Sequence, residues 1–186
     1  MNHPLDHLLR TGARVSPEKL GTASIAVRRI SRMDADILKR IRLKALQEAP
    51  SSFTQQLSEV VDKSDSYWSE WASTRATAKD TCVYLAFAGE SPIGMCGAYL
   101  EKENPQSAQL VAVWLEPAFR GSGMAYRLID SVIAWARHAA ATGITAWVTE
   151  DNLRARRFYL RLGFVEQVTR SQSPSGHSEI PMWRRI

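Results

Sequence analysis

The chain has 186 residues, the length of one domain that can bury a sizeable core, and its 45% hydrophobic and 23% charged residues are ordinary for a soluble globular protein. No uninterrupted apolar run reaches the roughly 18 residues that a membrane span needs, so no membrane partner is expected. The formal charge of +5 allows a nucleic-acid partner, but no interleaved aromatic signature accompanies the basic segment, so none is expected.

The first 23 residues are predicted to be a flexible extension that precedes a single domain over residues 24–186. This stretch contains two prolines and two glycines and shows little hydrophobic periodicity, although a docked helix over Leu5 to Arg10 is an alternative. It lacks the apolar segment of a secretory signal, and a cytoplasmic location is therefore expected.

Neither the cysteines nor the histidines indicate a metal site. Cys82 and Cys96 fall in two apolar segments, and in a reducing compartment they are expected to be free thiols in the core rather than a disulfide. The four histidines are scattered, and no cysteine–histidine cluster has metal-ligand spacing. No metal is therefore expected.

The first half of the domain is predicted to contain three strands and two helices. Ser31 and Asp34 resemble a capping box at the start of the first helix, and Trp68 and Trp71 lie three residues apart on one face of the second. The expected order is a strand over 24–30, a helix that ends before Pro50, a helix from about Ser64, and a hairpin of strands over 82–88 and 93–100.

The second half is predicted to alternate strands and helices. The order is a strand over 108–115, a helix from about Gly121 to Ala141 that Gly143 ends, a strand over 144–149, a helix from Asn152 to Leu162, and strands over 164–170 and 179–186. Gly163 suits the left-handed position that follows a helix. Together the elements predict an α/β fold with a mixed sheet and helices on both faces.

The stretch from Val111 to Ala125 predicts an anion site. It runs from a buried strand through a glycine-bearing turn into a helix, whose free N–H groups and positive dipole end attract anions. Gly121 and Gly123 lack the Cβ atoms that would keep a phosphate away from that backbone, and Arg120 adds a positive charge. An ordinary strand-to-helix connection is the alternative.

Two motifs resemble those of the GNAT N-acetyltransferase family. Arg120, Gly123 and Ala125 match the R-x-x-G-x-[GA] pattern of its acyl-CoA-binding turn, and Asn152 to Phe164 is similar to its N-x-x-A-x-x-x-Y-x-x-x-G-F signature. The close resemblance covers about residues 111–164. It implies the acyl-CoA N-acyltransferase fold, which has a central, mostly antiparallel sheet with a parallel pair splayed at its centre.

The resemblance implies acetyl-CoA as the cosubstrate. The strand before the turn would hydrogen-bond the pantetheine arm through its backbone, and the turn itself would hold the pyrophosphate. The residues expected to bind the cofactor are Val113, Trp114, Leu115, Arg120, Gly121, Ser122, Gly123, Met124, Ala125, Asn152 and Tyr159.

By the same resemblance, Tyr159 is the general acid at the sulfur of CoA. Many relatives place a glutamate base on the strand before the turn, but residues 108–115 contain no carboxylate. Glu150, at the end of the neighbouring strand, is the expected base, a water relay is equally plausible, and Glu48 is a more distant candidate. Glu116 is expected to face solvent.

The acceptor is expected to be a primary amine of a small molecule or a protein, and the sequence does not identify it. Phe53 and Trp68 are candidates for the acceptor pocket, although Trp68 also suits the core. A non-catalytic acyl-CoA-binding module is the alternative function, and the basic composition keeps a nucleic-acid-binding protein as a third. The resemblance also allows a homodimer.

Overall fold

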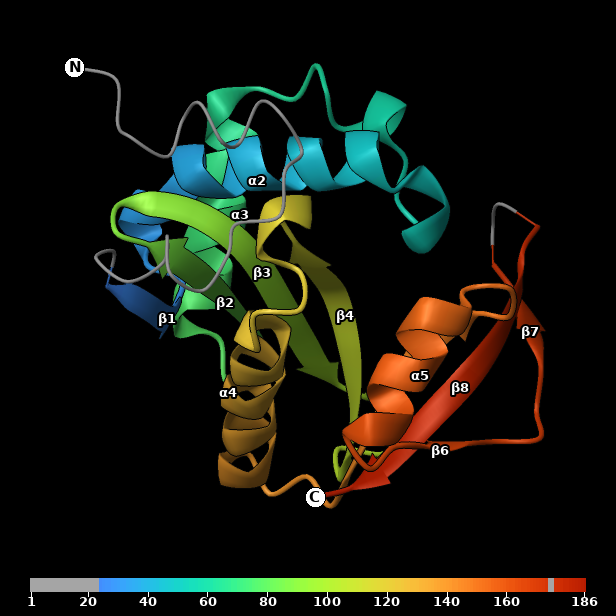
Figure 1. The fold of residues 1–186 in the computed structure, drawn as a ribbon. Coiled ribbons are helices and arrows are strands. Elements are labelled where there is room, and N and C mark those ends of the chain that lie inside the picture. The colour runs from blue at the N-terminus through green and yellow to red at the C-terminus, as the bar shows by residue number, and fades with distance from the viewer. Residues whose placement is uncertain (1–23, 174–175) are drawn as a thin grey trace.

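The computed structural model describes residues 24–173 and 176–186, and the extension predicted over residues 1–23 lies outside them. One sheet crosses the molecule between two groups of helices (Figure 1). Among the described residues, no helix is long and apolar enough to cross a membrane. The alternative of a docked helix over Leu5 to Arg10 also falls outside the described part.

The sheet is mixed, and all but one of its neighbouring strand pairs are antiparallel. Its strands follow the order β1-β2-β3-β4-β5-β8-β6, with β7 also paired to β8, and the one parallel pair is β4 with β5. The strands are β1 (Ile25–Arg29), β2 (Thr81–Ala88), β3 (Ser91–Leu100), β4 (Ser107–Leu115), β5 (Gly143–Thr149), β6 (Val165–Glu166), β7 (Ser171–Gln172) and β8 (Ser178–Arg185).

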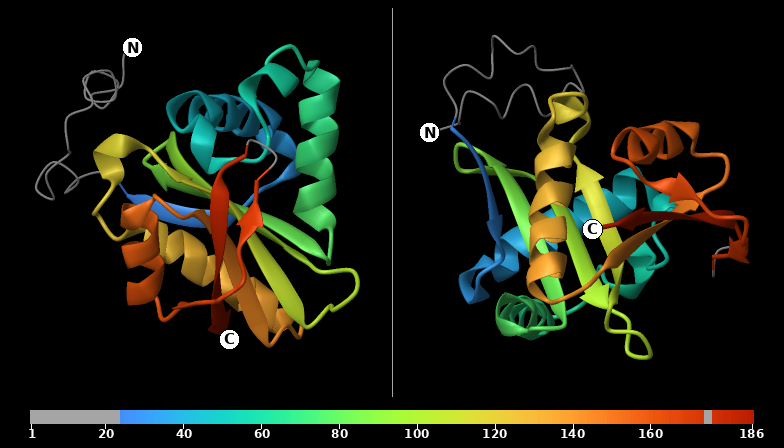
Figure 2. Two further views of the ribbon diagram at one scale, coloured as in Figure 1. Left: turned by 90° about the vertical axis from the view of Figure 1, so that its right-hand side faces the viewer. Right: turned by 90° about the horizontal axis from the view of Figure 1, so that it is seen from below.

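The helices cover both faces of this sheet, as two further views show (Figure 2). Helices α2 (Ala35–Glu48) and α3 (Asp65–Thr77) pack over one face, and α4 (Met124–His138) and α5 (Leu153–Arg161) belong to the core on the other. Short 3-10 turns lie at Arg32–Asp34, Pro50–Ser52, Leu57–Glu59 and Pro117–Phe119. The predicted α/β class, with helices on both faces, is confirmed.

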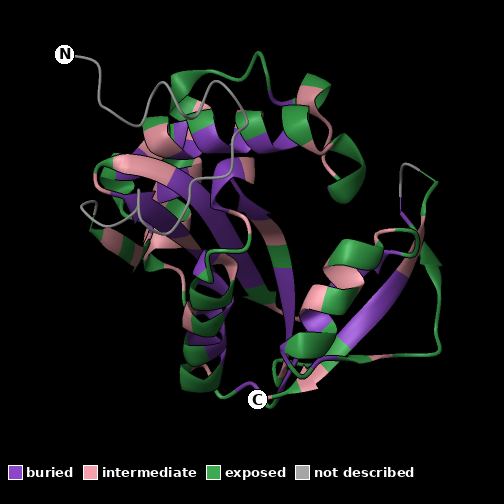
Figure 3. Ribbon diagram, in the orientation of Figure 1, coloured by how far each residue is buried: buried purple, intermediate pink, exposed green. Residues whose placement is uncertain are grey.

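Each face has its own hydrophobic core, because the strands alternate their side chains between the two. In α4, Met124, Leu128, Val132 and Ala136 recur every four residues and are buried. Figure 3 shows the buried residues of α2 and α4 on the sides that face the sheet. This spacing places the buried residues on one face of α4, which packs on the sheet.

The parallel pair is splayed. Hydrogen bonding between β4 and β5 covers only residues 107–110 of β4, paired with 143–146 of β5, and stops before either strand ends. Two features of β4 lie where the pairing stops: its register with β3 shifts between Val111 and Trp114, and Ala112 has a φ of 54°. The centre of the sheet therefore opens toward the carboxyl ends of both strands.

Three predicted boundaries differ from the structure. The helix expected from Gly121 begins at Met124 and ends at His138, because Gly121 and Gly123 have φ near +85°, outside the helical region. Gly143 does not end that helix but starts β5, where Trp183 packs so closely that a Cβ would clash. The strand expected over 164–170 is reduced to the two-residue strand β6, and β7 is a separate element.

Candidate functional site

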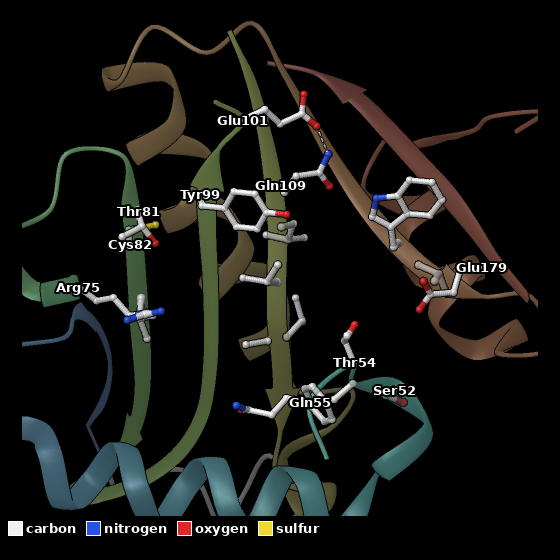
Figure 4. Close-up of a pocket in the computed structure, with 18 of the residues that line it drawn as sticks. Ser52, Thr54, Gln55, Arg75, Thr81, Cys82, Tyr99, Glu101, Gln109 and Glu179 are labelled. Carbon is white, nitrogen blue, oxygen red and sulfur yellow. Dashed lines mark hydrogen bonds between the residues drawn. The ribbon is translucent and has the colours of Figure 1, made fainter. Parts of the chain in front are cut away.

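A cleft of about 1350 Å³ opens at the splay (Figure 4). Its walls come from β2, β3, β4, β5 and β8, from α2, α3 and α5, and from the loop that follows α2. Val113, Asn152 and Tyr159, which the sequence assigned to one site, all line it. Segments that are far apart in the chain thus meet where β4 and β5 lose their hydrogen bonds.

The turn before α4 presents free backbone donors. Gly121, Ser122 and Gly123 are exposed, and the N–H groups of Gly121, Gly123, Met124 and Ala125 donate to no acceptor among residues 24–173 and 176–186. A Cβ built at either glycine meets no heavy atom within 4 Å, so the space in front of the turn is open. Open space, free N–H groups and a helix N-terminus together suit a phosphate.

Arg120 is already paired with a carboxylate. Its Nη1 and Nη2 donate to the two carboxylate oxygens of Glu48 at 3.1 and 2.5 Å, and its Nε donates to the Leu115 carbonyl at 2.9 Å. Trp114 Nε1 donates to the same carboxylate at 3.0 Å, and these bonds lower the pKa of Glu48 against the opposing effect of burial. Glu48 therefore ties α2 to the end of β4.

Glu116 does not face solvent as expected. It is 5% exposed and forms an ion pair with Lys44 of α2. The expectation was wrong because it considered only the strand end, whereas α2 packs over that end and covers the carboxylate. The pair adds a second tie between α2 and the segment that leads into the turn.

Tyr159 projects from α5 into the core beside the cleft. It is 6% exposed, and its ring packs edge-on against Phe158 and Phe164 with centroids 5.4 and 5.2 Å away. Burial raises the pKa of the Tyr159 hydroxyl far above its ordinary value of 10. The hydroxyl is therefore held in its protonated form, which a proton donor needs.

Asn152 starts the helix that carries Tyr159. Its side-chain oxygen accepts the backbone N–H of Ala155 at 3.0 Å, which confirms the predicted N-cap. Asn152 also lines the cleft. Asn152 and Tyr159 of the signature are therefore structurally linked. The cap at Asn152 fixes where α5 begins, and the start of α5 determines the direction in which Tyr159 points.

Glu150, the expected base, lies outside this cleft. It lines a separate small pocket with His177 and Ser178. Its carboxylate accepts from Ser178 Oγ at 2.8 Å and from Arg170 Nε at 3.3 Å, and these bonds lower its pKa. Both the position and the lowered pKa disfavour the role of general base, which stays a prediction.

Glu179 is a cleft carboxylate that sequence reasoning missed. It lies on β8 opposite Thr149 of β5, lines the cleft, and is half-buried. Burial raises its pKa, which suits a proton acceptor better than the lowered pKa of Glu150. Only the pairing of β5 with β8 reveals it, because 30 residues separate it from Thr149 in the chain.

Of the two aromatic candidates for the acceptor pocket, Phe53 lines the cleft and Trp68 does not. Phe53 lines the cleft, with the guanidinium of Arg42 4.8 Å from its ring centroid. Trp68 is 2% exposed in the core between α2, α3 and the sheet, and it does not line the cleft. Trp71, one turn further along α3, lines the cleft in its place.

Comparison with known proteins places the chain in a family. The profile of the acetyltransferase (GNAT) family matches residues 43–164, which include most of the residues that line the cleft. The chain therefore belongs to this family, as its two motifs indicated. The match also begins inside α2 and ends at Phe164, so it takes in the turn, the splayed strands and α5.

Individual relatives agree with this assignment. An uncharacterized N-acetyltransferase of Methanocaldococcus jannaschii is 27% identical over 54% of this chain and 46% of its own length, and one of Mycobacterium bovis is 32% identical over 44% and 53%. The chain thus spans about half the length of these curated relatives. YncA, a putative acetyltransferase of Salmonella typhimurium solved with acetyl-CoA, shares the fold with a TM-score of 0.70 at 15% identity, covering 87% of this chain and 93% of its own.

Proposed function

We propose that the protein is an acetyl-CoA-dependent N-acetyltransferase that acetylates a primary amine. One observation carries the proposal: the splay of β4 from β5 forms a cleft that the buried Tyr159 lines, and β4 then leads into a turn with free N–H groups that lies outside this cleft. Membership in the GNAT family and the acetyl-CoA bound to YncA support the choice of cosubstrate.

The residues of the turn and of β4 fit coenzyme A. The turn over Arg120 to Ala125 would bind the pyrophosphate through its backbone N–H groups. The backbone of Val113 to Leu115 would bind the pantetheine arm, since β5 has stopped pairing with β4 by that point. Arg120 would add less charge than its sequence position suggests, because Glu48 already neutralises it.

When bound, acetyl-CoA supplies an acetyl thioester that a neutral amine can attack. Unpaired N–H groups at the splay would stabilise negative charge on the thioester oxygen. Tyr159 would donate its proton to the departing sulfur as negative charge develops there. Glu179 would accept a proton from the amine, directly or through water.

Calorimetric titration with acetyl-CoA, followed by turnover assays on a panel of primary amines, tests the proposal. We expect micromolar binding by the wild-type protein. Tyr159→Phe is expected to keep that affinity and to lose at least about 100-fold in kcat, the scale of general acid catalysis. Tyr84→Phe is the matched control, since Tyr84 lies on β2 and does not line the cleft.

Two outcomes would contradict the proposal in different ways. If the wild-type protein does not bind acetyl-CoA, the cofactor site is refuted. If it binds acetyl-CoA but no amine on the panel is acetylated, the non-catalytic acyl-CoA-binding module becomes the better description. Equal turnover by the wild-type protein and Tyr159→Phe would agree with an acetyltransferase but would refute Tyr159 as its proton donor.

A further inference from the structure

Arg42 is a buried cation in the wall of the cleft. It lies on α2, is 9% exposed, and lines the cleft. Its Nε and Nη2 both donate to one neutral oxygen, Gln55 Oε1, at 3.3 and 3.1 Å. Its Nη1 is buried and has no hydrogen-bond partner among the described residues. One of the three guanidinium nitrogens therefore lacks an acceptor in the described part of the chain.

Arg75 lies in the same wall. It projects from α3 into the cleft, and its guanidinium is stacked 3.8 Å from the ring centroid of Trp71. Burial lowers the pKa of both arginines, that of Arg42 to about 10, and the charge of Arg75 contributes to the lowering at Arg42. Two like charges are thus held close enough to oppose each other.

Within residues 24–173 and 176–186, no carboxylate forms an ion pair with either arginine. The cleft is also lined by five carboxylate residues, Glu59, Asp80, Glu101, Glu103 and Glu179. Glu59 accepts the Gln56 N–H and Glu101 accepts the Gln109 side chain, and none of the five forms an ion pair with Arg42 or Arg75 in the described part of the chain. A buried charge without a counter-ion is costly, and a ligand of opposite charge would offset that cost. Stacking on Phe53 and Trp71 holds both guanidiniums ready for such a ligand.

Building on the proposed function, we infer that the amine acceptor also bears a carboxylate, which Arg42 and Arg75 bind. A guanidinium and a carboxylate match in planar, bidentate geometry, and both arginines line the same wall of the cleft. The phosphates of coenzyme A are not the expected occupant, because the turn that suits them precedes α4, whose core lies on the opposite face of the sheet.

The cleft also provides separate places for the two ends of such an acceptor. Figure 4 shows Arg75 and Glu179 on opposite sides of the cleft, with Gln55 between them in this view. A carboxylate on the arginine side would leave the amine free to extend toward Glu179 and the splay. An amino acid, or a longer molecule with both groups, fits this division of charge.

Matched pairs of acceptors test the inference. Each pair consists of a diamino acid and the diamine that lacks only its α-carboxylate. Lysine with cadaverine and ornithine with putrescine are two such pairs. Calorimetry on the protein saturated with CoA measures acceptor binding without turnover, and kcat/KM with acetyl-CoA measures it with turnover. We expect the carboxylated member to be preferred at least about 10-fold, as lost charged hydrogen bonds imply.

Arg42→Gln and Arg75→Gln are expected to remove most of that preference and to leave acetyl-CoA affinity unchanged. Arg40→Gln is the control, since Arg40 is exposed on the same helix and does not line the cleft. Arg75 is half-buried, so its variant tests the idea even if Arg42→Gln does not fold, which circular dichroism would reveal.

Equal binding of both members of each pair would overturn the inference and leave the acetyltransferase assignment intact. Loss of acetyl-CoA affinity in the arginine variants would also overturn it, because the arginines would then belong to the cofactor site. Binding of acetyl-CoA with no acetylation of any amine would contradict the proposed function, whereas the calorimetric preference for carboxylates would still be measurable.

Discussion

We define the acceptor wall as Arg42, Phe53, Gln55, Trp71 and Arg75. The proposed sites at this wall and at the turn before α4 would bind their ligands by different means. The turn offers backbone N–H groups, and its shape requires two glycines with positive φ. The wall offers side chains from α2, α3 and the loop after α2, and no unusual backbone is needed there. A backbone site is therefore recognisable as a short motif, whereas a side-chain site is assembled from distant parts of the chain.

The largest expected effect comes from breaking the turn. Gly123→Glu places a side chain at a φ of +84° and a negative charge where a phosphate would bind. We expect acetyl-CoA affinity to fall at least about 100-fold, which is about 3 kcal/mol, by calorimetry. Acceptor binding to the wall, measured in the absence of CoA, should not change.

Gly89→Glu is the control for this variant. Gly89 also has a positive φ, of 59°, but it lies in the turn between β2 and β3 and does not line the cleft. It should lose stability through strain and keep its affinity for acetyl-CoA. Equal loss of affinity in both variants would show that strain, rather than the position of Gly123, is responsible.

The next effect distinguishes the two glutamates at the end of the splay. Glu179→Gln removes a half-buried carboxylate of the cleft and is expected to lower kcat about 100-fold, the lower end of the range for general base catalysis. Glu150→Gln is expected to retain wild-type turnover, because Glu150 lines a different pocket. The reverse result would restore Glu150 as the base.

The stability of α2, which carries Arg42 of the acceptor wall, is expected to depend on pH through Asp34. Asp34, at the start of α2, is 3% exposed and accepts two hydrogen bonds from Arg28, at 2.6 and 2.7 Å. These bonds lower the pKa of Asp34 from 3.8 to about 2. Its ionised form therefore stabilises the fold above pH 3.8, and this contribution of about 2 kcal/mol is lost as pH falls through 2.

Asp34→Asn should lower the free energy of unfolding at neutral pH and should remove that part of the acid dependence. Urea unfolding at pH 7 and at pH 3 measures both quantities. Asp65→Asn is a matched control, because Asp65 pairs with Lys39 in an exposed position and should matter little. An unchanged acid dependence in Asp34→Asn would show that other carboxylates control acid unfolding.

The smallest expected effect comes from Glu48, which links α2 of the acceptor wall to the segment before the turn. Glu48 binds both Arg120 and Trp114, so Glu48→Gln weakens the tie between α2 and the segment before the turn. We expect a loss of about 1 kcal/mol in the free energy of unfolding, the value of a typical hydrogen bond. Acetyl-CoA affinity should change only a few-fold. A large loss of affinity would mean that the turn depends on α2.

Local patterns in the sequence predicted most of the fold. Alternation and helical spacing identified the strands and helices, and Asn152 marked the start of α5 correctly. The two motifs predicted the family, which the family profile confirms over residues 43–164. These features succeed because they depend on residues close together in the chain.

The expectations that failed have two causes, the packing of distant elements and the backbone conformation of glycine. Glu116 was expected in solvent, but Lys44 and α2 cover it. The helix after the turn begins later than expected because its two glycines adopt positive φ. Glu179 was missed because its place in the cleft depends on the pairing of β8 with β5.

The sequence by itself determined the family, the order of the elements and the position of the turn, since glycines, caps and hydrophobic periodicity act within a few residues. Tertiary structure decided that Glu179 and not Glu150 lines the cleft, that Trp68 is buried, and that Arg42 and Arg75 lie in one wall without an ion-pair partner among the described residues. Those properties arise only when α2, α3 and β8 pack against the splayed strands, because burial and charge pairing depend on neighbours that are distant in the chain.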